Sequence, residues 1–214
     1  MATHLRHGLD LPVAHLPSFV PDEEHASESL SPADPYFLYV GRLEHIKGAH
    51  TLIEPFRRWG KVPLKIAGTG HDERALRRLA GDGGLIRLLG YTTGEALRRL
   101  YAGAIAVIVP SLCFEIAPLV ILEAFREGTP VIVRNRGALP EPVEDSGGGL
   151  VYESDAELVA ALERLSSNRD FRDALGRRGR EHYRSEWTAD AHMKRYLGLI
   201  DELREKRGRR ALSA

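Results

Sequence analysis

Short apolar runs alternate with amphipathic stretches along most of this 214-residue chain, from Tyr36 onward. The apolar runs are continuous and do not alternate with polar residues, which is typical of strands covered on both faces of a parallel sheet. They predict strands at Phe37–Val40, Leu64–Ala67, Ile86–Leu89, Ala104–Pro110, Pro130–Arg134 and Gly149–Tyr152.

The stretches between these runs have the period of an amphipathic helix. In Glu73–Ala80 and Gly94–Ala102, leucine and alanine recur at i, i+3 and i+4, while arginines occupy the opposite face. Other predicted helices are Ala49–Trp59, Leu119–Glu127, Leu139–Glu144, Ala156–Ser166, Asp170–Tyr183 and Thr188–Arg207. The alternation predicts an α/β fold, a Rossmann-like doubly wound parallel sheet with helices on both faces, followed by C-terminal helices.

The first 35 residues differ from the rest of the chain. They lack periodicity and are rich in histidine and proline, and their only strand-like piece is Leu11–Val20. We therefore expect three parts. Residues 1–35 are a linker or the remnant of an N-terminal domain, residues 36–186 are a ligand-binding Rossmann-like domain, and residues 187–214 form a last helix and a basic tail.

Composition excludes several classes of protein. Lys and Arg number 30, as do Asp and Glu, so the chain lacks the basic surplus expected for nucleic-acid binding. The single cysteine, Cys113, excludes an internal disulfide and fits a reducing compartment. No apolar run approaches the ~18 residues of a membrane span. We expect a cytoplasmic protein, with peripheral attraction of the tail Lys206–Arg210 to a membrane as the alternative.

Ligands of doubly wound sheets bind beyond the carboxyl ends of the strands, which gives a short set of candidate residues. Arg42 and Lys47 follow the first predicted strand. Lys47 falls at the start of a predicted helix, where a cation opposes the helix dipole unless an anion also docks there. Small-residue turns at Gly68-Thr-Gly70 and Gly90-Tyr91 follow the next two strands and allow close approach to the backbone.

Two glutamates eight residues apart follow the fourth strand. Glu115 lies in the loop, and Glu123 interrupts an apolar helical series that Pro118 is well placed to open. A charge in such a series is costly to desolvate without a partner, so either an ion pair or a ligand hydroxyl is expected. Together with the two cations, these carboxylates suit a diphosphate joined to ribose on one side and to a sugar on the other.

The order of motifs resembles the C-terminal, donor-binding half of GT-B glycosyltransferases of retaining family 4, the glycosyl transferases group 1. The resemblance covers about residues 36–203. It rests on Tyr39-Val-Gly-Arg-Leu-Glu-His-Ile-Lys-Gly48, Lys65-Ile-Ala-Gly-Thr-Gly70, Leu89-Gly90, Val109-Pro-Ser111, the Glu115/Glu123 pair and Gly128-Thr-Pro-Val131.

The resemblance implies roles for matching residues. Arg42 and Lys47 would bind the donor diphosphate and stabilise the leaving group, and Glu115 would contact the transferred sugar. Glu123 would hold the ribose hydroxyls. The remaining implied contacts come from the backbone of Ile116, Ala117, Pro118 and Leu119 to sugar or phosphate, from Gly68 and Gly70 to the nucleotide, and from Gly90 and Tyr91 to the base. The family retains anomeric configuration by front-face transfer and uses no metal and no cofactor besides the nucleotide sugar.

The sequence departs from the family in two places. Ile116-Ala-Pro118 stands where many members have a bulky residue, an aromatic residue and glycine, which leaves the choice of sugar open. The family also forms its acceptor site from a whole N-terminal domain, of which only Leu5–Val20 resembles the end. The resemblance therefore implies an N-terminal acceptor domain in the same or another chain, without which transfer is weak or absent.

Three functions remain open at this point. The leading one is the donor-binding domain of a retaining hexosyltransferase acting on an unidentified glycan, lipid or small-molecule acceptor. A non-catalytic nucleotide-sugar-binding subunit of a split enzyme and a sugar-nucleotide epimerase are the alternatives. A hydride-transferring dehydrogenase is disfavoured because no Gly-x-Gly-x-x-Gly follows the first strand.

Overall fold

A six-stranded parallel sheet forms the centre of the computed structural model, which describes residues 14–22 and 34–212, with side chains to residue 206. Every neighbouring pair of strands is parallel, and the spatial order is β3-β2-β1-β4-β5-β6. The strands are β1 (Phe37–Val40), β2 (Leu64–Ala67), β3 (Ile86–Gly90), β4 (Val107–Val109), β5 (Val131–Arg134) and β6 (Gly149–Tyr152). The predicted Rossmann-like doubly wound sheet is confirmed.

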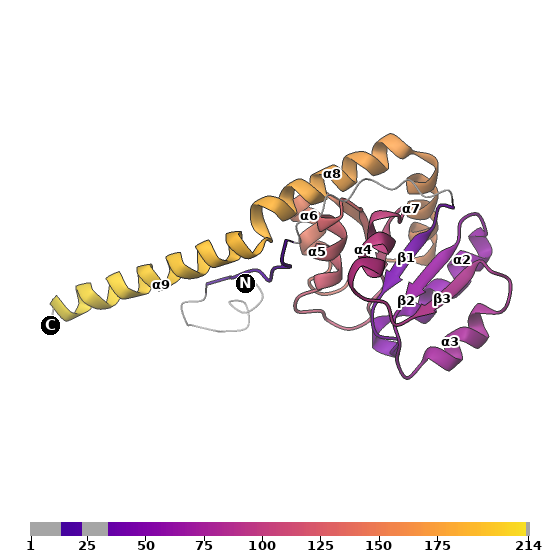
Figure 1. Cartoon of the computed structure of the whole chain (residues 1–214), viewed down its shortest axis with the longest axis horizontal. Coiled ribbons are helices and arrows are strands. Elements are labelled where there is room, and N and C mark those ends of the chain that lie inside the picture. The colour runs from indigo at the N-terminus through magenta and orange to yellow at the C-terminus, as the bar shows by residue number, and fades with distance from the viewer. Residues whose placement is uncertain (1–13, 23–33, 213–214) are drawn as a thin grey trace.

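Helices cover both faces of this sheet, and the last one projects away from it (Figure 1). They are η1 (His45–Lys47), η2 (Ala49–Leu52), α2 (Ile53–Trp59), α3 (Glu73–Ala80), α4 (Gly94–Ala102), α5 (Leu119–Arg126), α6 (Pro140–Ser146), α7 (Asp155–Ser167), α8 (Arg169–Glu186) and α9 (Ala189–Leu212). In the described part of the chain, none of these helices is both long and apolar enough to span a membrane.

Each face of the sheet contributes to a separate apolar core, as expected for strands that are apolar throughout. Phe37 points into a core completed by α2 and α7, while its neighbour Leu38 points into the opposite core with α5 and α8. Both residues are 0% exposed. Successive side chains of a strand point to opposite faces, so a strand buried on both sides needs an unbroken apolar run.

The helix predicted at Ala49–Trp59 is instead divided. Residues 49–52 form the 3-10 helix η2, and the α-helix α2 begins at Ile53. Pro55 explains the division, because a proline deep inside an α-helix loses a backbone hydrogen bond and its ring clashes with the carbonyl four residues earlier. The tighter winding before Ile53 leaves Pro55 in the first turn of α2, where proline is tolerated.

The strand-like piece predicted at Leu11–Val20 is wrong for its described part, residues 14–20, which join no sheet. This segment lies along the junction of α8 and α9. The Val20 amide donates to the Trp187 carbonyl at 3.2 Å, and the Tyr183 hydroxyl donates to the Val20 carbonyl at 2.8 Å. The Val20 backbone groups are therefore used by residues at the end of α8, and the prolines at 17 and 21 are unsuited to a central strand.

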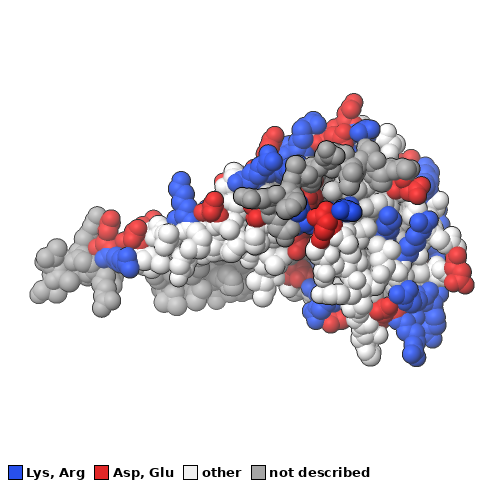
Figure 2. Space-filling view, viewed as in Figure 1, with Lys and Arg blue, Asp and Glu red and all other residues white. Residues whose placement is uncertain are grey.

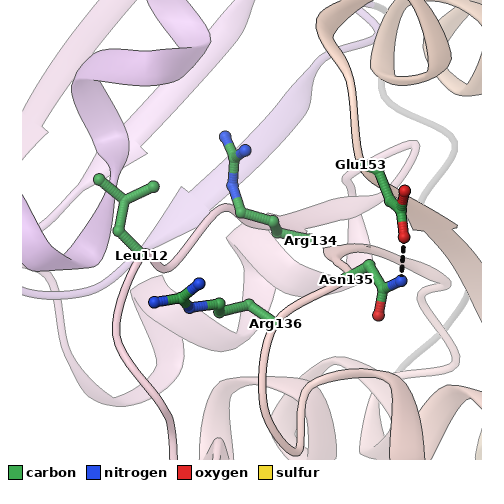
Figure 3. Close-up of a pocket in the computed structure, with 5 residues that line it drawn as sticks. All are labelled: Leu112, Arg134, Asn135, Arg136 and Glu153. Carbon is green, nitrogen blue, oxygen red and sulfur yellow. Dashed lines mark hydrogen bonds between the residues drawn. The ribbon is translucent and has the colours of Figure 1, made fainter.

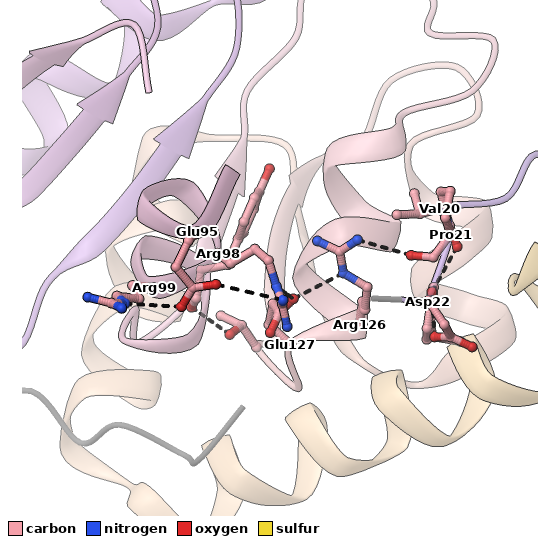
Figure 4. A network of polar contacts seen from close by, with 11 residues as sticks. Val20, Pro21, Asp22, Glu95, Arg98, Arg99, Arg126 and Glu127 are labelled. Atoms are coloured by element: carbon pink, nitrogen blue, oxygen red, sulfur yellow. Dashed lines mark hydrogen bonds and ion pairs between the residues drawn. The ribbon is translucent and has the colours of Figure 1, made fainter. Parts of the chain in front are cut away.

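A network of charged side chains holds the end of this segment against the helices (Figure 4). Glu127 has a side chain only 2% exposed, and it accepts hydrogen bonds from Arg98 at 3.1 Å and Arg126 at 3.0 Å. Arg126 also donates to the Pro21 carbonyl at 3.1 Å. Helix α5, which begins at the edge of the sheet where the carboxyl ends of the strands meet, is thus connected at its other end to Pro21.

Candidate functional site

The strand order reverses direction between β1 and β4, which are neighbours in the sheet but distant in sequence. Ligands of open α/β sheets bind outside the carboxyl ends of the strands at such a point. Here the loops contact each other, because the amides of Leu112 and Cys113 donate to the Ile46 carbonyl at 2.8 and 3.3 Å. The loops after β1 and β4 therefore form one structural unit.

Gly48 allows this close contact. Its φ is +75°, and a Cβ placed there would lie 2.2 Å from the Pro110 carbonyl oxygen. Any other residue would both strain the backbone and clash with the loop after β4. Gly48 is thus a residue on which the site depends, although no ligand need touch it.

Lys47 and Glu115 meet at the centre of this unit, 68 residues apart in sequence. The Lys47 Nζ lies 2.6 Å from Glu115 Oε1, and the two side chains are 22% and 16% exposed. The Ser111 hydroxyl donates to the same oxygen at 2.7 Å, and the Cys113 thiol lies 3.6 Å from it. The structure therefore brings together one of the predicted cations and one of the predicted carboxylates.

Glu115 is ionised at neutral pH in this setting. Burial on its own would raise the pKa of Glu115, but hydrogen bonds from Lys47 and Ser111 and the positive charge of Lys47 outweigh it, so the pKa is lowered. The carboxylate is thus held charged and in one orientation beside the Lys47 ammonium.

The prediction that Lys47 opens a helix is wrong. Lys47 is the last residue of the three-residue η1, and the α-helix begins only at Ile53. The expected conflict with a helix dipole therefore does not arise. The Lys47 charge is instead balanced within the chain by Glu115.

Arg42, the second predicted cation, is anchored through its backbone next to this pair. The Tyr39 hydroxyl donates to the Arg42 carbonyl at 2.8 Å, and burial followed by the charges of Glu115 and Glu44 raises the pKa of Tyr39. The Arg42 side chain itself is 64% exposed and pairs with Glu44 at 2.7 Å. It is free to reorient, since exposed pairs of this kind contribute only ~0–1 kcal/mol.

Glu123, the second predicted carboxylate, pairs with a different residue. It is half-buried in the second turn of α5, and its Oε2 accepts a hydrogen bond of 2.5 Å from the buried Tyr101 hydroxyl. Burial and the nearby Glu123 carboxylate raise the pKa of Tyr101 well above its ordinary value, so the phenol stays a donor. The structure thus gives Glu123 a partner within the chain, one that sequence reasoning missed.

The loop predicted to offer backbone amides is exposed but offers fewer than expected. Ile116 is 97% exposed, Pro118 is the N-cap of α5 and has no N–H, and the Leu119 amide already donates to the Ala117 carbonyl at 2.9 Å. Only the amides of Ile116 and Ala117 among these four residues remain as candidate donors to a ligand.

The glycines after β2 have a packing reason that the sequence did not reveal. A Cβ on Gly68 would lie 1.9 Å from the Gly41 carbonyl oxygen, and one on Gly70 would lie 2.4 Å from that of Leu43. Gly68 also donates to the Gly90 carbonyl at 2.8 Å, while Tyr91 beyond it is 78% exposed. These residues lie at the predicted edge of the sheet, and nothing in their contacts identifies a ligand.

A hollow of about 360 Å³ opens at the same edge, beyond β5 and β6. Arg42, Lys47, Glu115 and Glu123 do not line it. Most of its wall consists of residues at strand ends, because Arg134 ends β5 and Glu153 directly follows β6. The lining residues are Leu112, Arg134, Asn135, Arg136 and Glu153.

Comparison with known proteins identifies the family of the chain. The sequence profile of the family "Glycosyl transferases group 1" matches residues 21–182. The lipopolysaccharide core biosynthesis glycosyltransferase LpsE of Rhizobium meliloti (strain 1021) is 32% identical over 173 residues, which are 79% of this chain and 51% of LpsE. The chain thus spans about half the length of that relative.

Solved structures show the same architecture. Sucrose-phosphate synthase (tll1590) from Thermosynechococcus elongatus superposes with a TM-score of 0.79 at 22% identity, over 96% of this chain and 56% of that one. Anabaena Alr3699/HepE, solved in complex with UDP and glucose, gives a TM-score of 0.71 at 18% identity, over 79% and 48% of the two chains. Such likenesses establish the fold, one half of a GT-B glycosyltransferase. With the profile covering most of its length, the chain belongs to the glycosyl transferases group 1 family.

Proposed function

We propose that this chain is the donor-binding half of a retaining glycosyltransferase, which transfers a sugar from a nucleoside-diphosphate sugar to an acceptor. The observation that carries the proposal is the Lys47–Glu115 contact of 2.6 Å between the loops that follow β1 and β4. A cation and an oriented carboxylate lie together at the point of the sheet where ligands bind. The complex of HepE with UDP and glucose, in a protein of the same fold, supports a nucleotide sugar as the ligand.

In this proposal Lys47 and Arg42 bind the diphosphate. An ammonium group has three donors, and Lys47 uses one for Glu115, which leaves others for phosphate oxygens. Arg42 can exchange its exposed contact with Glu44 for a phosphate. Both cations would then oppose the negative charge that develops on the departing nucleoside diphosphate.

Glu115 and Glu123 contact different parts of the donor. Glu115, held ionised by Lys47 and Ser111, faces the transferred sugar and accepts from its hydroxyls. Tyr101 orients the Glu123 carboxylate through one oxygen, and the other oxygen is left to accept from the ribose. The backbone at Gly68, Gly70 and Gly90–Tyr91 borders the nucleotide.

Transfer also needs an acceptor domain, supplied by the same polypeptide or by another chain. Helix α9 supports this part of the proposal, because it extends away from the sheet domain and carries exposed apolar side chains (Figure 1). On the side seen in Figure 2, uncharged side chains fill most of the visible, described stretch of α9, and charged ones lie along its upper edge and toward its far end. The exposed apolar side chains are Met193, Tyr196, Leu197 and Leu203, between 45% and 57% exposed.

The test is nucleoside-diphosphate binding by the whole chain. A thermal-shift screen of UDP, GDP and ADP selects the nucleotide, since a ligand of the folded state raises its stability by mass action. Calorimetry then compares Arg42→Ala with Arg99→Ala. Arg99 is a matched control, because its side chain is 69% exposed and its pair with Glu95 measures 3.1 Å.

We expect Arg42→Ala to weaken binding by about tenfold or more, as for loss of a charge-assisted contact to phosphate. Arg99→Ala should leave the affinity unchanged. Failure of all three nucleotides to stabilise the wild-type chain, or equal affinities for the two variants, would contradict the assignment.

A further inference from the structure

The hollow beyond β5 and β6 is positively charged and adjoins the Lys47–Glu115 pair. Its residues come from the carboxyl ends of three neighbouring strands, with Leu112 after β4, Arg134 at the end of β5 and Glu153 after β6. Figure 3 shows the Arg134 and Arg136 side chains on the side of Leu112, while Glu153 lies on the other side and pairs with Asn135. The one carboxylate in the wall is therefore occupied by an amide.

Both arginines keep an unneutralised charge. Neither has a carboxylate within ion-pair distance among the described residues. Arg134 donates to the Pro110 carbonyl at 3.2 Å and to the Thr51 hydroxyl at 3.1 Å, and it lies 5.0 Å from the centre of the Tyr152 ring. These partners are neutral, so they orient the guanidinium without cancelling its charge.

Arg136 is held in a similar way. Its guanidinium stacks on the Phe114 ring at 4.5 Å, and the side chain is exposed. Stacking fixes the plane of a guanidinium while its N–H groups at the edge remain available to a ligand. Two oriented guanidiniums in one hollow, neither in an ion pair with a described carboxylate, are suited to bind a phosphate or carboxylate.

Residues that contact the hollow are direct sequence neighbours of residues in the proposed donor site. Phe114, on which Arg136 stacks, is next to Glu115, and Pro110, to which Arg134 donates, precedes Ser111, the hydroxyl partner of Glu115. Leu112 donates through its amide to the Ile46 carbonyl, beside Lys47. An anion in the hollow would therefore lie beside the carboxylate proposed to contact the transferred sugar.

We propose that the hollow between Arg134 and Arg136 is an anion subsite, which holds a phosphate or carboxylate group of the sugar acceptor next to the site of transfer. The inference rests on the proposed glycosyl transfer. The diphosphate of the donor is assigned to Arg42 and Lys47, so the pair at 134 and 136 serves a different anionic group. A carboxylate on the donor sugar is the other anion that would fit the hollow. The second measurement below distinguishes it from an acceptor group.

The first measurement is an NMR titration of the full chain with inorganic phosphate, following the arginine Nε–H and backbone amide signals. We expect saturable shifts at Arg134, Asn135 and Arg136. Arg136→Ala should weaken phosphate binding by about tenfold, as for loss of a charge-assisted contact. Arg136→Lys should weaken it less, because the charge remains but the fork of donors is lost.

Arg78→Ala is the control, because Arg78 is an exposed arginine on α3, outside the hollow, and its removal should not alter phosphate affinity. Absence of saturable shifts at Arg134 and Arg136, or equal phosphate affinities for wild type and Arg136→Ala, would overturn the proposal. The Arg136 side chain is exposed and packs on the exposed Phe114 ring, so its removal should leave the fold intact and the variant reports on binding.

The second measurement identifies the source of the anion. Glucose 1-phosphate and glucuronic acid 1-phosphate share a hexose ring and a phosphate, and only the second has a carboxylate. Equal affinities support an acceptor group as the occupant. At least tenfold tighter binding of the glucuronic acid derivative, lost in Arg136→Ala, would assign the hollow to the donor sugar and refute the acceptor assignment.

Nucleoside-diphosphate binding is measured separately on the wild-type chain. A chain that binds the nucleotide but shows no phosphate response at Arg136 refutes the anion subsite and keeps the proposed function. A chain that binds no nucleoside diphosphate refutes the proposed function, whatever the hollow binds.

Discussion

The pair formed by Lys47 and Glu115 contributes both to folding and to the proposed site, and a double-mutant cycle separates the two contributions. The perturbations are Lys47→Met, Glu115→Gln and the double variant. Lys47→Met leaves the Glu115 carboxylate, 16% exposed, with the Ser111 hydroxyl and the Cys113 thiol as its remaining partners. Glu115→Gln leaves the Lys47 ammonium with only a neutral partner.

The magnitude follows from burial. Exposed ion pairs contribute ~0–1 kcal/mol, whereas removing one partner of a fully buried pair costs ~3–5 kcal/mol. With side chains 22% and 16% exposed, the Lys47–Glu115 pair lies between these limits. We expect each single substitution to lower the free energy of unfolding by about 2 kcal/mol. The coupling energy between the two residues should be about 1–2 kcal/mol.

The assay is urea denaturation at pH 7, followed by circular dichroism, with unchanged m-values as the sign that the folded and unfolded states remain comparable. Arg77→Met is the control. The Arg77–Glu73 pair has a similar nitrogen–oxygen distance, 2.7 Å, but its side chains are 51% and 28% exposed. That substitution should lower the free energy of unfolding by about 0.5 kcal/mol or less, as is usual for ion pairs on a helix surface.

The pH dependence gives an independent check. The pKa of Glu115 is lowered from its ordinary value of 4.5, so its ionised form stabilises the folded state above that pH. This stabilisation should disappear as the pH falls below about 4.5, and Lys47→Met should make the loss smaller. A coupling energy below about 0.5 kcal/mol, within the error of additivity, together with an unchanged acid limb would refute the reasoning.

Three further predictions concern other residues. Glu127→Ala should destabilise the chain by about 3–5 kcal/mol in urea denaturation, because it leaves Arg98 and Arg126 without their buried carboxylate; a loss below ~1 kcal/mol would show that solvent replaces it. Glu123→Gln should weaken a nucleoside diphosphate more than pyrophosphate in calorimetry, whereas Tyr101→Phe, which removes only the phenol partner, should have the smaller effect; equal losses for both ligands would exclude a ribose contact. Gly48→Ala should separate the loops after β1 and β4 and lower the thermal midpoint, because its Cβ would lie 2.2 Å from the Pro110 oxygen; an unchanged midpoint would mean that the loop after β4 shifts without strain.

Local patterns in the chain were sufficient for the fold. The apolar runs at Phe37–Val40 and Leu64–Ala67 and the helical period of Glu73–Ala80 and Gly94–Ala102 match the observed elements. Burial of a strand or a helix face depends on residues two to four positions apart, which are visible in any short window. The division between η2 and α2 was predictable in principle, since Pro55 is in the printed sequence.

Contacts between distant residues depended on the path of the chain through the sheet. Lys47 and Glu115 are brought together because β1 and β4 are neighbours, and Tyr101 meets Glu123 because α4 packs beside α5. The sequence also could not show that Arg134 and Arg136 lack a carboxylate partner among the described residues, because this depends on which carboxylates lie nearby in space. Periodicity records which side of an element is buried, whereas the order of strands decides which side chains share an edge, and only the assembled sheet contains that order.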